Sequence, residues 1–175
     1  MDTKMQEAIA LRENGRAEEA RVLLLDLLAA ESKDDAADAG ADSISGSNAE
    51  LLYQLAWTHD VLGLEREAVP YYKQSLAIGL PLEQRIGALL GLGSTYRTLG
   101  EYTRARTILQ QAAEEFPEWA EFQAFLAMTL YNLGEHGEGM GILLRLLAET
   151  SANTGIQEYR KAISFYADKL DQVWK

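Results

Sequence analysis

The sequence of 175 residues contains no cysteine. Disulfide bonds, thiolate chemistry and cysteine-based zinc sites are therefore excluded, and the absence is compatible with a reducing compartment. Basic residues are also scarce, because 16 Lys and Arg stand against 27 Asp and Glu, giving a formal net charge of −11. Binding to nucleic acid or to an anionic membrane surface depends on basic side chains. The composition therefore argues against both kinds of partner.

Long apolar runs are missing as well. The longest strongly apolar run, from Val22 to Ala30, is interrupted by Asp26 and is far too short to cross a bilayer. The first residues lead directly into a polar helical pattern, without the apolar core of a signal peptide. We therefore expect a cytoplasmic protein. The length suits a single domain over residues 1–175.

Four segments of the sequence resemble one another. Each runs from a small residue to a glycine seven positions later, and these glycines are Gly15, Gly63, Gly100 and Gly134. Further small or apolar residues follow at five and twelve positions after each glycine: Ala20, Ala68, Ala105 and Gly139, then Leu27, Ser75, Ala112 and Leu146. The last two glycines are 34 residues apart, and the extra residues in the two longer spacings fall between helices, where insertions are tolerated. This pattern predicts an internal repeat.

The residue types at the repeated positions suit two antiparallel helices joined by a tight turn. A glycine ends the first helix where a left-handed residue is needed. The small residues let the two helices approach closely, since a large side chain would hold them apart. Three larger residues, Tyr72, Leu109 and Leu143, follow the small one by four positions, and we expect them to fill the remaining space between helices.

The third unit carries the fullest pattern and identifies a family. It reads Leu92-Gly93-x-x-Tyr96, then Gly100, Ala105, Leu109, Ala112 and Pro117, which resembles the tetratricopeptide repeat signature. The second unit is similar, with His59 where the family usually has tyrosine, whereas the first and fourth are more degenerate. The resemblance implies an all-α fold, a right-handed superhelix (α-solenoid) of four helical hairpins at about 1–30, 49–82, 86–119 and 120–153. The alternative is a generic bundle of helical hairpins with chance spacing.

The helical pattern continues beyond the fourth unit. The eight helices of the repeats are expected at about 2–13, 17–30, 49–61, 65–78, 83–98, 102–115, 119–132 and 137–149. A ninth helix is expected at 155–174, with one apolar stripe formed by Ile156, Tyr159, Ile163, Tyr166, Leu170 and Val173. Repeat arrays need a cap over their open end, which favours a capping helix. The heptad-like spacing leaves a dimerisation stripe as the alternative.

Residues 31–48 form an acidic insertion that is nearly free of large apolar side chains. Such a segment cannot bury enough surface to offset the entropy of ordering it, so we expect a solvated loop, part of which extends a helix or is held by neighbours. Its aspartates, which include Asp34, Asp35, Asp38 and Asp42, do not follow the register of an EF-hand loop. A calcium site is therefore disfavoured.

No catalytic or cofactor-binding pattern emerges from the remaining residues. The only histidines are His59, expected to pack within a helix, and His136, expected in a turn, and neither has the spacing of a catalytic triad or a metal site. We therefore expect no enzyme activity, no cofactor and no metal. Three glycines, Gly137, Gly139 and Gly141, begin one helix and indicate either close packing or a hinge.

In the family that the sequence resembles, ligands lie in a groove lined by the first helices of the units. Helical spacing maps that groove to Met5, Ile9, Arg12, Tyr53, Trp57, Asp60, Leu90, Ser94, Arg97, Ala124, Met128 and Tyr131. Trp57 is the expected anchor. The alternative is that Trp57 and Tyr53 pack between neighbouring first helices or against the ninth helix folded inward. The lysine, asparagine and arginine residues with which some members of the family hold acidic chaperone tails are absent from the matching positions.

The resemblance therefore predicts a module that binds another protein or peptide of apolar or amphipathic character. Self-association as a homodimer, through the groove or the last helix, is the alternative from a different class. An enzyme on an all-helical scaffold is a third hypothesis.

Overall fold

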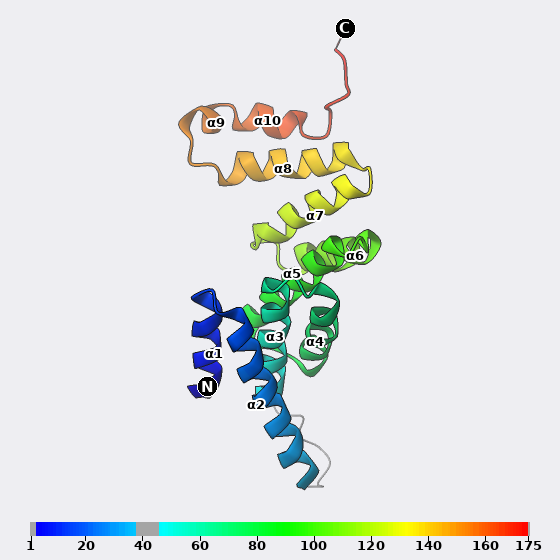
Figure 1. The fold of residues 1–175 in the computed structure, drawn as a ribbon. Coiled ribbons are helices and arrows are strands. Elements are labelled where there is room, and N and C mark those ends of the chain that lie inside the picture. Colours follow the sequence, from blue (N-terminus) through cyan, green and yellow to red (C-terminus); the bar gives the residue numbers. More distant parts are fainter. Residues whose placement is uncertain (1–2, 38–45, 175) are drawn as a thin grey trace. The chain divides into compact units, whose positions relative to one another are not determined.

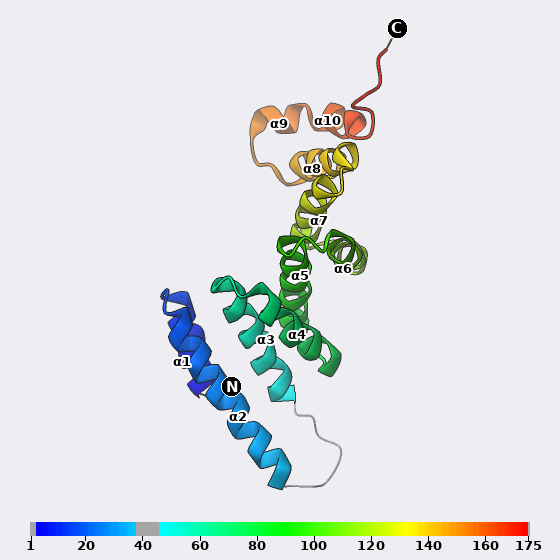
Figure 2. The same ribbon diagram turned by 45° about the vertical axis from the view of Figure 1, so that its right-hand side comes forward.

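The computed structural model describes residues 3–37 and 46–174, and this part of the chain is helical without any strand. Its helices are α1 (Thr3–Glu13), α2 (Ala17–Ala37), α3 (Gly46–Val61), α4 (Glu65–Ile78), α5 (Leu82–Thr98), α6 (Tyr102–Glu115), α7 (Ala120–Asn132), α8 (His136–Thr150), α9 (Thr154–Glu158) and α10 (Arg160–Tyr166). Within each of two parts of the chain, helices that follow one another in the sequence pack against one another: α1 to α5 in the first part, and α6 to α10 in the second (Figures 1 and 2). The predicted all-α solenoid of helical hairpins is confirmed.

The glycines that mark the repeat do what the spacing predicts. Gly15, Gly63, Gly100 and Gly134 have φ angles of 78°, 72°, 77° and 83°. These angles lie in the left-handed region, which residues with a Cβ rarely adopt, so each glycine ends a first helix and turns the chain into the second.

The contacts divide the chain into two compact units, Met1–Leu99 and Gly100–Lys175. The expectation of one domain over the whole chain stays a prediction. In the first unit, α2 packs on α1 and on α3, and α4 packs on α3 and on α5. Its core includes Leu24 of α2 together with Leu51 and Leu55 of α3. Each second helix is thus covered by the first helix of the next hairpin.

In the second unit, α7 packs on both α6 and α8, and α10 packs on α8 (Figures 1 and 2). Two glycines make these contacts close. A Cβ on Gly139 would lie 2.9 Å from the carbonyl oxygen of Ala127 in α7, and one on Gly141 would lie 2.5 Å from that of Ala167 after α10. Close packing, one of the two interpretations of these glycines, therefore holds at Gly139 and Gly141.

The C-terminal helix was predicted with the wrong length. Instead of one helix over 155–174, the chain forms two short helices that meet at Tyr159, and helix α10 ends at Tyr166. Most of the predicted stripe is exposed, including Tyr159, Leu170 and Val173. Helices of this length depend on tertiary packing. The last buried contact, at Ala167, lies just beyond the end of α10.

The acidic insertion at 31–48 is helical at its start. Helix α2 continues to Ala37, and α3 begins at Gly46. Residues 31–37 thus extend α2, and residues 46–48 belong to α3, in line with the expectation that part of the segment extends a helix. Residues 38–45, with the aspartates Asp38 and Asp42, lie outside the described residues.

Candidate functional site

A buried arginine joins the first helices of the first two hairpins. Arg12 of α1 is buried, and its Nη1 donates a hydrogen bond to Oε1 of Gln54 in α3 at 2.8 Å. The same nitrogen lies 3.4 Å from Oγ1 of Thr58, one turn further along α3. Burial lowers the pKa of the Arg12 guanidinium, because desolvation penalises the charged form. These bonds lock α1 and α3 together through polar side chains.

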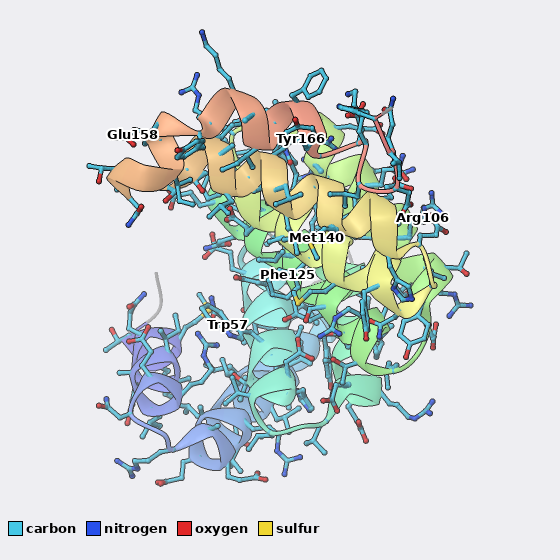
Figure 3. All side chains as sticks on the ribbon, turned by 90° about the horizontal axis from the view of Figure 1, so that it is seen from above. Trp57, Arg106, Phe125, Met140, Glu158 and Tyr166 are labelled. Atoms are coloured by element: carbon cyan, nitrogen blue, oxygen red, sulfur yellow. The ribbon has the colours of Figure 1, made fainter. Side chains whose placement is uncertain are left out.

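The ring of Trp57 packs against the guanidinium of Arg12. The Cζ of Arg12 lies 3.9 Å from the centroid of the Trp57 ring, which is the geometry of a cation–π contact. Tyr53, one turn earlier on α3, lies with its ring centroid 5.9 Å from that of Trp57. Despite these two neighbours, Trp57 is 42% exposed. Figure 3 labels it at the edge of α3 that faces α1.

A second polar contact joins α3 to α5 through Asp60. The hydroxyl of Tyr72 donates to Oδ2 of Asp60 at 2.8 Å, and the hydroxyl of Thr95 lies 2.8 Å from both carboxylate oxygens. Burial raises the pKa of Asp60, and the hydrogen bonds from Tyr72 and Thr95 oppose this shift. Burial, followed by the charge of Asp60, raises the pKa of the Tyr72 hydroxyl as well. The carboxylate thus connects two first helices with the second helix between them.

Two glycines of α5 make room for the tyrosines of this site. A Cβ on Gly87 would overlap the hydroxyl of Tyr53, and one on Gly91 would overlap the hydroxyl and ring of Tyr72. Both tyrosines are buried. The helix α5 therefore has glycine at these positions because the facing side chains reach its backbone.

The structure distributes the predicted groove residues of the first unit over different environments. Met5, Arg12 and Tyr53 are buried, so they support the surface and do not line a free groove. The physical reason for this correction is that α2 and the neighbouring first helix α3 already cover Met5, while α5 covers Tyr53. The half-buried residues are Ile9, Asp60, Leu90, Ser94 and Arg97. Trp57 is the one exposed member of this set.

The remaining predicted groove residues belong to the second unit. Met128 and Tyr131 are exposed on α7, and the Tyr131 ring lies 4.7 Å from that of His136. Ala124, one turn before Met128, is half-buried. That these residues share one surface with Trp57 involves both units and stays a prediction.

Sequence reasoning missed the polar partners of Arg12. Gln54 and Thr58 are four residues apart on α3 and flank Trp57, and both are buried. Polar residues at helical spacing beside a buried arginine are the signal that could have found this contact. His59 was interpreted as a packing residue; it is buried, and its Nδ1 lies 2.7 Å from the carbonyl oxygen of Leu55.

A hollow of about 410 Å³ lies between α8 and the segment after α10. Its lining includes Arg145 and Lys169 as well as Glu138, Asp168 and Asp171. Charges of both signs at an open position do not select one ligand class. Within the described ranges, no group of three or more acidic or histidine side chains is arranged to hold a metal ion.

The chain contains helical hairpins whose turns are closed by glycines with left-handed φ angles. Trp57 is exposed on one of the first helices. These features define a helical repeat protein. The model of the tetratricopeptide repeat family matches residues 49–170 of the chain, and the chain belongs to this family. Members of the family generally mediate protein–protein interactions and are typically non-catalytic scaffolds. In the ranges 3–37 and 46–174, no helix has the length and apolar character needed to span a membrane.

Solved structures share the fold at low sequence identity. One is a crystal structure of nearly identical TPR-like repeats from a provisionally assigned kinesin light chain of Podosopora anserina, with 21% identity and a TM-score of 0.69, covering 97% of this chain and 85% of that one. A variant of the same protein gives the same values. The MamA RS-1 ArsTM double mutant is 16% identical, with a TM-score of 0.57 and 98% of both chains covered. No curated protein sequence matches the chain.

Proposed function

We propose that this chain is a non-catalytic interaction module whose first unit binds an apolar or amphipathic segment of another protein at Trp57. The observation that carries the proposal is the exposure of Trp57 among buried neighbours. Tyr53, Gln54, Leu55, Ala56, Thr58 and His59 are all buried, whereas Trp57 is 42% exposed. A large aromatic side chain that remains accessible on a first helix is the type of residue that dominates binding energies at protein interfaces.

The support beneath Trp57 also favours binding. Arg12 covers one side of the indole ring, and Arg12 is itself held by Gln54. A side chain held in place before binding loses little conformational entropy when a partner arrives. The partner is expected to contact the exposed part of the ring with apolar side chains, in the manner of an amphipathic helix or an extended peptide.

The test is a comparison of two tryptophan variants in binding to a partner captured from native lysate and then purified. Trp57→Ala is expected to weaken binding by ~2 kcal/mol or more in calorimetric titration. Trp119→Ala is the control, because Trp119 is a half-buried tryptophan just before α7 in the second unit and belongs to neither proposed binding surface. Equal loss in both variants, or none in Trp57→Ala, would contradict the proposal.

Stability must be measured on the same variants. Trp57 is only partly buried, so its replacement is expected to lower the melting temperature much less than replacement of a core residue. If Trp57→Ala unfolds the protein while its folded fraction binds the partner normally, Trp57 is a core residue, and the assignment of the binding surface fails.

Self-association is a second candidate function, and the C-terminal aromatic residues favour it. Phe165, Tyr166 and Trp174 are exposed and contact one another, with ring centroids between 5.2 and 6.3 Å apart. An exposed aromatic cluster is a surface on which two copies of a chain can meet. Light scattering on the full chain and on Phe165→Ser tests it, since a dimer held by this cluster is expected to dissociate in the variant.

A further inference from the structure

The second helices of the four hairpins can be compared position by position from their turn glycines. Nine residues after each glycine stands a large side chain: Leu24, Tyr72, Leu109 and Leu143. The first three are at most 2% exposed, whereas Leu143 of α8 is 41% exposed. The sequence predicts packed residues at Tyr72, Leu109 and Leu143, so the exposure of Leu143 needs a physical reason.

In the earlier hairpins, the first helix of the following hairpin covers this position. Leu24 of α2 packs with Leu51 and Leu55 of α3. The hydroxyl of Tyr72 in α4 reaches the backbone of α5 at Gly91. In the second unit, α7 packs on α6, and Leu109 of α6 is fully buried. A covering helix is therefore the regular neighbour of this face.

The segment after α8 does not take that place. Helix α10 and the turn after it approach α8 at Gly141, seven residues after the turn glycine, where Ala167 lies against the backbone. The equivalent residues of the other second helices, Val22, Pro70 and Thr107, are exposed. Positions seven and nine after the glycine are about 200° apart around a helix. The C-terminal segment thus covers the face that is solvent-exposed in the other hairpins.

The face that a next hairpin would cover is consequently open. It carries Met140, Leu143 and Leu147, which are all exposed and lie three and four residues apart on α8. We call these three residues the end face, and Met140 is labelled in Figure 3. An apolar stripe at this spacing lies on one side of a helix and suits contact with a second helix.

We propose that the end face binds an amphipathic helix of another protein, which takes the place of the first helix of a further hairpin. The proposal rests on continuity with the helix contacts within this chain, because the same face of the earlier second helices is covered by a helix. The covering helices α3 and α7 bury apolar residues four apart, Leu51 with Leu55 and Phe122 with Leu126. The partner helix is expected to carry such a pair.

A second copy of this chain cannot supply that helix by stacking head to tail. In α1, the residues at the positions of Leu51 and Leu55 are Thr3 and Glu7, and both are exposed. Burying Glu7 against Leu143 would desolvate a carboxylate without a partner, which is costly. The end face of α8 is therefore apolar, whereas the corresponding positions of α1 are polar, and the two do not match.

A peptide copied from this chain serves as the probe. Residues 48–62, capped at both ends and labelled with fluorescein, contain the pair Leu51 and Leu55 that covers Leu24. Fluorescence anisotropy with the full chain is expected to show saturable binding. Leu143→Lys and, separately, Leu147→Lys are expected to weaken it at least tenfold. Val22→Lys is the matched control, since Val22 is an exposed apolar residue on α2, and it should bind like the parent.

The remaining outcomes separate this proposal from the proposed function. Trp57→Ala is expected to leave peptide binding unchanged, because Trp57 is in the other unit. The proposal is overturned if the peptide does not bind, binds Leu143→Lys as well as the parent, or loses binding in Trp57→Ala. It is also overturned if sedimentation shows a dimer that Leu143→Lys dissociates, since a second copy would then occupy the end face. Circular dichroism checks that each variant is folded.

Discussion

Helices α4 and α8 are the second helices of their hairpins, yet they are covered on different faces. In α4, Tyr72 is buried against α5, and Pro70 on the other face is exposed. In α8, Leu143 is exposed, and Gly141 on the other face is buried. The repeat pattern thus selects which residues are apolar or small, but the neighbouring helix decides which of them lie in the core.

The glycines of the two contacts have different roles. At the α4–α5 contact, Gly91 is on the covering helix and makes room for a side chain. At the α8–α10 contact, Gly141 is on the covered helix and makes room for a backbone carbonyl. A Cβ would clash at both glycines, but at Gly91 the facing group is the Tyr72 side chain, whereas at Gly141 it is the backbone of the segment that follows α10. Substitutions in the two units test this difference.

The largest expected effect on the free energy of unfolding is at the position nine residues after the turn glycine, which is Tyr72 in α4 and Leu143 in α8. Tyr72→Ala is expected to lower the free energy of unfolding by about 3–5 kcal/mol, as for other large buried aromatic residues. Leu143→Ala is expected to cost less than about 1 kcal/mol, because Leu143 is already largely exposed. Urea unfolding of both variants measures this. Similar losses would mean that α8 is covered at Leu143 in solution.

Substitutions at the two glycine contacts are expected to differ in how much of the protein they destabilise. Gly91→Ala places a Cβ against the buried Tyr72 ring, at 2.5 Å from Cζ, so we expect global destabilisation of about 1–3 kcal/mol. Gly141→Ala is expected to release α10 locally instead. Hydrogen exchange measures this, with faster exchange confined to residues 160–167. Uniform destabilisation in Gly141→Ala would show that α10 is an essential part of the second unit.

Each unit contains a carboxylate whose contribution to folding stability depends on pH, and the two contributions are expected to change in opposite directions. Burial raises the pKa of Asp60, so the folded state binds this proton more tightly than the unfolded chain, and this contribution to stability grows as pH falls through the folded pKa. The hydrogen bond from Lys169 lowers the pKa of Asp168, so its contribution is lost as pH falls.

Asparagine variants at both positions test these signs. Relative to the parent, Asp60→Asn should gain less stability when the pH is lowered from 7 to about 4. Asp168→Asn should show the opposite difference, and a smaller one, because Asp168 is exposed. Thermal melts across this pH range measure both slopes. The same sign in both variants would contradict the assignment.

The smallest expected effect is at the glycine of α8 that has no close neighbour. A Cβ on Gly137 would meet nothing within 4 Å. Gly137→Ala is therefore expected to stabilise the protein by at most about 1 kcal/mol, through helix propensity alone. Chemical denaturation, with Gly139→Ala as the contrasting variant, measures this. Destabilisation by Gly137→Ala would show that this glycine has a neighbour in solution.

Much of the fold could be predicted from residue types alone. The turn glycines and the small residues around them, such as Gly100 and Ala105, act through local backbone geometry and close helix contact, which the spacing makes visible. The two hairpins with the fullest pattern were placed to within a few residues. The candidate site was less predictable: Trp57 was expected on an accessible surface and is exposed, but Tyr53 was expected beside it and is buried.

Residue types and their spacing suffice to predict the helical hairpins, the position of their turns and the apolar residues of each helix, because these depend on contacts a few residues apart. Three other features follow from packing between helices: Arg12 bonds to Gln54, helix α10 ends at Tyr166, and Leu143 remains exposed. Each of these depends on which helix lies alongside another, and that choice is set by packing between segments distant in the chain. Helical periodicity reports the apolar side of a helix but carries no information about what covers it.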